Sequence, residues 1–153
     1  MKEFEERFTE LQADMISICM EYINDRADKV YIYASCEGNI ISSKFFYLIN
    51  NQYVKSHQVN DALEDEDEDE RYDTSPKRGF MVLDILNEDI EKIEALCKEN
   101  NRDMPTEMRL IYDVKSGHFT AEYNYELVYT NDDVKTASYN ANEWFEKVKR
   151  NRL

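Results

Sequence analysis

The densest chemistry in this chain is a run of seven consecutive carboxylates within residues 61–73. Oxygen ligands suit Ca²⁺, but the run lacks the glycine and the spaced ligands of an EF-hand loop, so any such binding should be weak. The carboxylates could instead mimic phosphates and occupy the basic groove where a nuclease holds its nucleic acid. A solvated insertion with no partner is the third interpretation. The candidate partner-binding residues are Asp61, Glu64, Asp65, Glu66, Asp67, Glu68, Asp69, Glu70, Tyr72 and Asp73.

No catalytic arrangement stands out elsewhere in the sequence. His57 lies among polar residues and His118 directly follows a glycine, and neither has a Ser or Cys nearby in a recognisable arrangement, so both are expected to face solvent. Gly38, Gly79 and Gly117 stand alone and indicate turns, not a phosphate-binding loop. We therefore expect a protein that is not an enzyme and that holds no cofactor and no metal.

The three cysteines, Cys19, Cys36 and Cys97, are widely spaced among apolar neighbours. An odd count without a CxxC motif is typical of reduced, buried thiols in a cytosolic protein. Residues 1–6 contain no apolar signal segment, and no run approaches the roughly 18 apolar residues of a membrane span. The sequence therefore predicts a cytoplasmic protein with no membrane contact.

Length and charge restrict the classes of partner. A chain of 153 residues with 42% hydrophobic content suits one domain, here residues 1–153. The net charge of −14 and the pI near 4.5 disfavour direct binding to nucleic acid or to an anionic membrane. An acidic surface can attract a basic protein, or it can simply keep the protein soluble.

The first half of the chain predicts a helix followed by a meander. Apolar residues recur at spacings of three and four over residues 4–22, which indicates an amphipathic helix. Strands are expected at 30–36, 40–49 and 52–59 because these segments are rich in β-forming residues. Asn50 and Asn51 suit a two-residue hairpin turn, since asparagine tolerates positive φ.

The middle of the chain changes character twice. Residues 61–78 are expected to form an acidic surface loop, because dense like charges repel one another. Residues 80–86 fit either a short strand or the start of a helix. Asn87 is a plausible N-cap, with Glu88 and Asp89 in the first turn. The helical stripe then runs to about Asn100.

The last third predicts a hairpin and a helix. Residues 108–114 and 119–125 alternate between apolar and polar around a turn at 115–117. Asn131, Asp132 or Asp133 is expected to cap a final helix that carries Trp144 and ends in a basic turn. The predicted class is α+β: an antiparallel sheet, made of the meander and the C-terminal hairpin, with an N-terminal, a middle and a C-terminal helix covering one face.

Tyr31 and Tyr33 form a second candidate surface, because they share one side of the first strand. Tyrosine is enriched in protein interfaces, where it buries a large ring and keeps a polar tip. The alternative is a sheet face half covered by a helix.

Residues 107–126 resemble the hairpin of the YezG-like antitoxin family. The matching features are the apolar strand from Glu107 to Tyr112, the turn Ser116-Gly117-His118-Phe119, and the return strand ending in Tyr125-Glu126. The family more often has lysine where this chain has His118. The first helix, the strand that follows it and the terminal helix are also similar to the family pattern, whereas the acidic run departs from it.

The resemblance implies an immunity protein encoded beside a secreted or contact-delivered bacterial toxin, often a nuclease. Such a protein binds the toxin domain and blocks its active site or its substrate path, and the family offers no catalytic residue to carry over. The expected partner is thus a cognate toxin domain, basic and possibly a nuclease. The alternative is a cytosolic adaptor or regulatory domain with no toxin partner.

Overall fold

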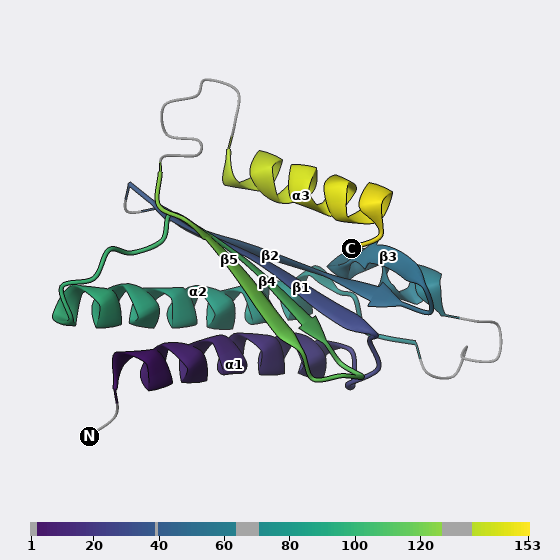
Figure 1. The fold of residues 1–153 in the computed structure, drawn as a ribbon. Helices are drawn as coiled ribbons and strands as arrows, with labels where there is room; N and C mark the ends of the chain where they lie inside the picture. The colour runs from purple at the N-terminus through teal and green to yellow at the C-terminus, as the bar shows by residue number, and fades with distance from the viewer. Residues whose placement is uncertain (1–2, 39, 64–70, 127–135) are drawn as a thin grey trace.

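The computed structural model describes residues 3–38, 40–63, 71–126 and 136–153, which form an α+β fold as predicted (Figure 1). In chain order the elements are α1 (Phe4–Tyr22), β1 (Lys29–Glu37), β2 (Ile40–Ile49), β3 (Gln52–Lys55), the 3₁₀ helix η1 (Ser56–Ala62), α2 (Pro76–Glu99), β4 (Glu107–Asp113), β5 (Phe119–Asn124) and α3 (Ala137–Asn151).

All neighbouring strands of the five-stranded sheet are antiparallel, in the order β3-β2-β1-β4-β5. Tyr31, in the central strand β1, lies opposite Phe46 of β2 and Ile111 of β4. The predicted turn at Asn50 and Asn51 is confirmed, with φ of 49° and 66°. Because directly opposed residues share a face, the register assigns every strand residue to one of two faces.

Helices α1 and α2 lie side by side against one face of the sheet (Figure 1). Their apolar stripes meet the side chains of Val30, Ile32 and Ala34 in the larger core cluster. The three cysteines are free and buried, as predicted. Burial raises the pKa of the Cys19 thiol well above its usual value, so this thiol stays protonated and unreactive.

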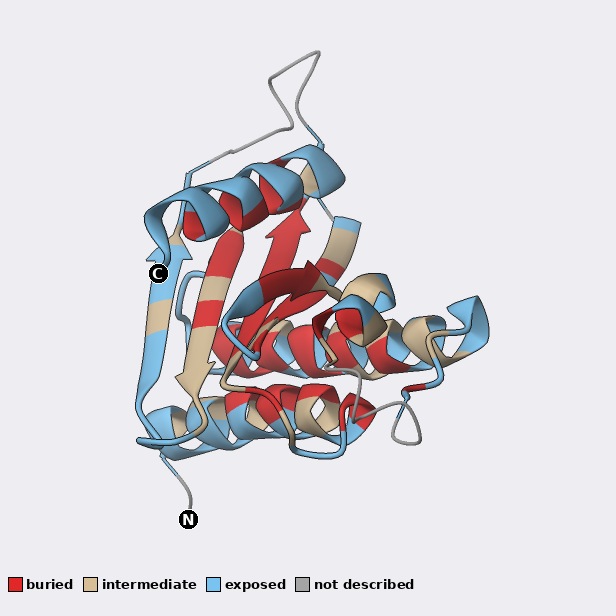
Figure 2. Ribbon diagram, turned by 90° about the vertical axis from the view of Figure 1, so that its right-hand side faces the viewer, coloured by how far each residue is buried: buried red, intermediate tan, exposed pale blue. Residues whose placement is uncertain are grey.

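Helix α3 covers part of the opposite face, so helices cover both faces and not one as expected (Figures 1 and 2). Trp144 and Phe145 of α3 pack on Tyr31, Tyr33 and Phe46, and all five side chains are buried. The ring of Trp144 lies 5.2 Å from that of Phe46 and 6.0 Å from that of Tyr31, measured between centroids. The two tyrosines therefore form the sheet side of a second core.

The third strand is shorter than the predicted 52–59. It ends at Lys55, and Ser56–Ala62 form the 3₁₀ helix η1. Three residues per turn bring Val59 and Ala62 to the same side, and both are buried. A buried Val59 is compatible with a strand and with a 3₁₀ helix, which is why the sequence predicted a longer strand.

Helix α2 begins at Pro76, so Asn87 is not its N-cap and the expected loop at 61–78 is shorter at both ends. Proline is favourable at the first helical position, where no backbone N–H is needed. Asn87 lies inside the helix and its Oδ1 accepts a hydrogen bond of 2.8 Å from the Ser43 hydroxyl of β2. The residues that mark the buried stripe are Val82, Leu86, Ile90, Ile93 and Cys97.

The predicted caps of the last helix, Asn131 to Asp133, lie outside the described residues. As described, α3 begins at Ala137, and the Thr136 side chain accepts a hydrogen bond of 3.1 Å from the Tyr139 N–H. The last turn is basic as predicted, with Lys149 and Arg150. Within the described part of the chain, no helix combines the length and the apolar content needed to cross a membrane.

Candidate functional site

The two chain points that flank the acidic run are hydrogen-bonded to each other. Asn60 Nδ2 donates to the Tyr72 carbonyl over 3.0 Å, and the Tyr72 N–H donates to Asn60 Oδ1 over 2.8 Å. The side-chain amide of Asn60 therefore pairs with backbone on both its donor and its acceptor side. Nearby, Asn50 Nδ2 donates to the Ala62 carbonyl over 2.8 Å. We call the Asn60–Tyr72 pair the clamp.

Two arginines attach the clamp to the helix layer. The Arg26 guanidinium lies 4.5 Å from the centroid of the Tyr72 ring. Arg78, in the first turn of α2, donates to the carbonyls of Asp73 and Tyr22 over 2.7 Å each. Its guanidinium also lies 4.4 Å from the Tyr22 ring centroid, in a cation–π contact. The end of α1 and the start of α2 are thereby joined at the point where the acidic run returns to the fold.

The predicted contact residues divide into three groups. Asp61 and Asp73 are exposed. The Ser75 N–H donates to the Asp73 carboxylate over 2.9 Å, which lowers the pKa of Asp73 below its usual value and keeps it charged. Tyr72 is only 7% exposed, and its ring packs under Arg26, so the ring offers little surface to a partner in this conformation. Glu64 to Glu70 lie outside the described residues.

Sequence reasoning missed two exposed apolar side chains on α2. Phe80 and Met81 are 63% and 57% exposed, one turn after Pro76. The exposed acids Asp84 and Glu88 follow Phe80 at intervals of four residues, so they lie on the same side of the helix. The signal was present in the sequence, since Phe80 and Met81 fall outside the stripe that contains Val82. The exposure of Phe80 and Met81 is not evident while residues 80–86 fit a strand as well as a helix.

A shallow hollow of about 290 Å³ opens beside Phe80, between the start of α2 and strand β2. Its lining includes Lys44, His57, Pro76, Phe80 and Leu83. His57 is exposed here, as predicted, and His118 is exposed at the far hairpin. We define the α2 surface as Phe80, Met81 and Asp84 on α2 together with Asp61 and Asp73, the exposed carboxylates next to the clamp.

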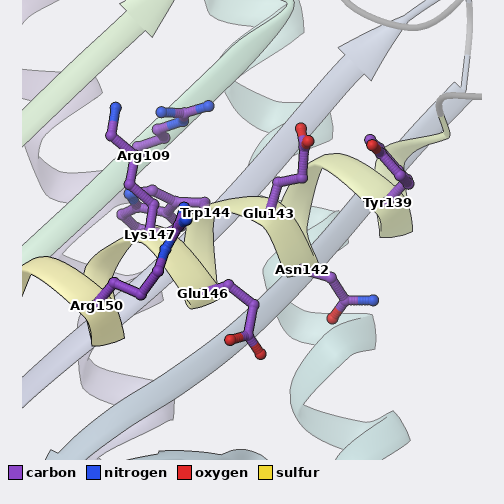
Figure 3. A pocket seen from close by; sticks show the side chains of 8 residues that line it. All are labelled: Arg109, Tyr139, Asn142, Glu143, Trp144, Glu146, Lys147 and Arg150. Carbon is purple, nitrogen blue, oxygen red and sulfur yellow. The ribbon is translucent and has the colours of Figure 1, made fainter.

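A second hollow, of about 600 Å³, lies between α3 and β4 (Figure 3). The side chains of Arg109, Lys147 and Arg150 gather at one end of it, and Tyr139 lies at the other (Figure 3). Trp144 also lines this hollow while its ring packs into the second core. The basic side chains of this hollow therefore lie next to Trp144, the residue through which α3 packs on the sheet.

Arg109 is engaged in holding this helix in place. Its Nε lies 3.4 Å from Oε1 of the buried Glu107, and its guanidinium lies 5.9 Å from the Trp144 ring centroid. The Tyr33 hydroxyl donates to Oε2 of the same carboxylate. Burial and this contact raise the pKa of Tyr33 above its usual value. Glu107 thus balances the charge of Arg109, so within this cluster Arg109 belongs to a structural ion pair.

A pair of carboxyl groups lies between α1 and α2. Asp89 of α2 is 2% exposed and shares a hydrogen bond with the side chain of Asp14 on α1. Burial, and then the neighbouring Asp14, raise the pKa of Asp89 to about 7. Its Oδ2 is buried, and no group in the described part of the chain bonds to it. The arrangement can hold one proton between two carboxyl groups.

Comparisons with known proteins add no relative. No protein-family model matches the chain, and no curated protein matches it. Among residues 3–38, 40–63, 71–126 and 136–153, no group of three or more His, Cys, Asp or Glu side chains is arranged to hold a metal ion. The candidate site must therefore be chosen from the geometry of this chain alone. We choose the α2 surface because it lies on the helix that follows the acidic run.

Proposed function

We propose that this protein is an immunity protein that binds a cognate bacterial toxin, a basic nuclease domain, and occludes its active site or substrate groove. The observation that carries the proposal is the clamp, which brings the two ends of the acidic run together just before α2, the helix whose second turn exposes Phe80 and Met81. Protein interfaces combine apolar anchors, which supply most of the binding energy, with a polar rim. The α2 surface offers both in one place.

Charge supports a basic partner. The molecule has a net charge of −14, and the carboxylates of Asp61, Asp73 and Asp84 in the α2 surface are exposed. Complementary charge accelerates association, while a desolvated aromatic anchor slows dissociation. The proposal places the protein in the cytoplasm, which its three free thiols favour.

The test is co-expression with the product of the adjacent open reading frame that encodes a toxin domain. Pull-down and rescue of growth are expected with the unaltered protein. The double variant Phe80→Asp, Met81→Asp is expected to weaken binding by about 30-fold or more, because loss of a central anchor costs about 2 kcal/mol. Ile40→Asp is the matched control, since Ile40 is 58% exposed near the β1–β2 turn.

Two results would count against the proposal. If the unaltered protein neither binds the toxin domain nor rescues growth, the function is not immunity to that toxin. If the double variant binds as tightly as the Ile40→Asp control, the α2 surface is not the contact. Circular dichroism of each variant establishes that the fold is retained, because all three positions are exposed.

A further inference from the structure

Strand β5 has an unpaired edge in the described part of the chain (Figure 2). The Asp113 N–H donates to the His118 carbonyl over 2.9 Å, which places even-numbered residues of the second hairpin strand toward β4. Phe119, Ala121 and Tyr123 therefore direct their backbone N–H and C=O groups away from the sheet. Such a row of groups is a template for another strand.

The opposite edge of the sheet is protected. Strand β3 has only four residues and continues directly into η1. The C-terminal end of the chain lies over it, where the Tyr53 hydroxyl donates to the Leu153 carbonyl over 3.0 Å and Arg152 donates to Asn51 Oδ1 over 2.6 Å. Proteins also protect edges with lysine or proline, and β5, with the sequence FTAEYN, contains neither.

We propose that β5 pairs antiparallel with β5 of a second copy, with Ala121 on the two-fold axis, so that two sheets join into one. In this register Phe119 lies opposite Tyr123 of the second copy, and Thr120 lies opposite Glu122. The strand is self-complementary, because aromatic residues meet on one face and a carboxylate meets a hydroxyl on the other. This inference is independent of toxin binding.

Neighbouring registers fit less well. A shift of one residue would oppose Ala121, whose backbone groups point outward, to Thr120, whose backbone groups point toward β4, so the two strands could not form a hydrogen-bonded ladder. Centring the pair on Glu122 would oppose two like charges, which is destabilising. Centring it on Thr120 would leave Tyr123 opposite the turn residue Gly117, whose φ is 73°. Ala121 is therefore the position that keeps the longest run paired.

An apolar groove borders the same edge. A hollow of about 460 Å³ runs between α1 and the β4–β5 hairpin, and its lining includes Ile16, Met20, Tyr112 and Phe119. Tyr123 of the second copy, opposite Phe119, lies on the groove side of the sheet. The Tyr123 ring packs edge-on against Phe8 of its own copy, with centroids 5.8 Å apart, and its hydroxyl accepts a hydrogen bond of 2.8 Å from Gln12 Nε2. The ring is 40% exposed, and this exposed part is what Phe119 of the second copy would meet. The self-complementary edge thus specifies a second copy as its occupant.

The proposed dimer interface is small, and the two negatively charged copies repel each other. Two six-residue strands bury less than the roughly 1,200 Å² of a stable complex, so the dimer should be weak and concentration-dependent. Each copy carries −14 charges, and salt screens this repulsion. Self-association should therefore strengthen as salt rises.

Sedimentation equilibrium over a concentration series at high salt tests the proposal. The mass should rise from 18.3 kDa toward twice that value. Ala121→Pro should hold it at one chain, because proline removes an outward N–H without removing a bond to β4. Glu146→Ala, at an exposed residue of α3, should dimerise like the unaltered protein. A mass of 18.3 kDa throughout, or dimerisation of Ala121→Pro, overturns the proposal.

A cross-link tests the register without relying on proline. Opposed α-carbons in a hydrogen-bonded pair lie about 5.5 Å apart, within disulfide range. Oxidised Ala121→Cys should form a covalent dimer, whereas Thr120→Cys, the neighbouring control, should not, because Thr120 does not oppose itself. Cross-linking through Thr120→Cys, or through neither variant, overturns the register. A protein that is monomeric alone but loses toxin binding in Ala121→Pro would assign the edge to the toxin instead.

Discussion

Asp89 is buried between two packed helices beside Asp14, and its raised pKa makes stability depend on pH. The pKa of Asp89 is raised to about 7 in the folded protein, against 3.8 as its usual value. The folded state therefore binds more protons than the unfolded state between about pH 4 and pH 7. The contribution of Asp89 to stability is complete below pH 4 and is lost as the pH rises through 7.

Asp89→Asn removes this titration while keeping the shape of the side chain. We expect the variant to gain stability relative to the unaltered protein as the pH rises from about 4 to 8, because the asparagine amide carries no charge to desolvate. Urea unfolding at a series of pH values measures this difference. Asp84→Asn, at an exposed position on the same helix, is the control. A difference between Asp89→Asn and the unaltered protein that does not change with pH would remove Asp89 as the titrating group.

At the scale of elements, α3 depends on a few aromatic contacts. Trp144 packs on Phe46, Tyr31 and Tyr33, and it is buried. Most other buried apolar residues of the described chain belong to the separate core under α1 and α2. Helix α3 is thus held by its own small core.

Trp144→Ala should weaken the docking of α3 by about 3–5 kcal/mol, the usual cost of truncating a buried aromatic residue. Hydrogen exchange should show the loss first in α3, while the core under α1 and α2 stays protected. Glu146→Ala, at an exposed position on the same helix, should change stability by about 0.5 kcal/mol or less. Equal loss of protection in all elements would show that α3 is not an independent unit.

The sequence predicts an element best when its apolar residues follow one spacing, helical or alternating, along the whole segment. Helix α1, strand β2 and the hairpin of β4 and β5 agree with the sequence, because their apolar residues follow a single spacing. The start of α2 was obscured because the exposed Phe80 and Met81 interrupt its stripe. The face taken by α3 was missed because alternation identifies two sides of β1 without saying what covers each.

The candidate site was predicted in part. The exposure of Asp61 and Asp73 follows from charge, but the burial of Tyr72 depends on Arg26 and Asn60. Those partners lie 46 and 12 residues away in the chain, by subtraction of the residue numbers, and no local pattern connects them. The α2 surface needed the helix boundary before its two apolar residues could be recognised as exposed.

At the scale of the whole molecule, charge is unevenly distributed. Exposed acids such as Glu6, Glu10 and Glu88 lie on α1 and α2, whereas Lys147 and Arg150 lie on α3. The proposed basic partner would therefore be steered toward the layer that carries the α2 surface, and away from the end of α3.

Salt should act in opposite directions on the two proposed associations. The association rate with the toxin should fall by about tenfold or more from low to high ionic strength, whereas self-association should strengthen. Replacing Glu64 to Glu70 with Ser and Gly should flatten the first dependence. Stopped-flow association and sedimentation measure the two effects. A toxin association rate that ignores salt would remove the steering role, and an unchanged rate in the Ser/Gly variant would remove the acidic run from it.

The Asn60–Tyr72 clamp also has an evolutionary consequence. Because the fold itself closes the chain between these residues, a longer or different intervening sequence costs little, about 0.6 kcal/mol for each doubling of length. Changes in length there leave Ala62 and Leu63, which pack in the core, in place. If the protein is an immunity protein as proposed, the clamp lets the acidic segment vary with the toxin while the fold stays constant.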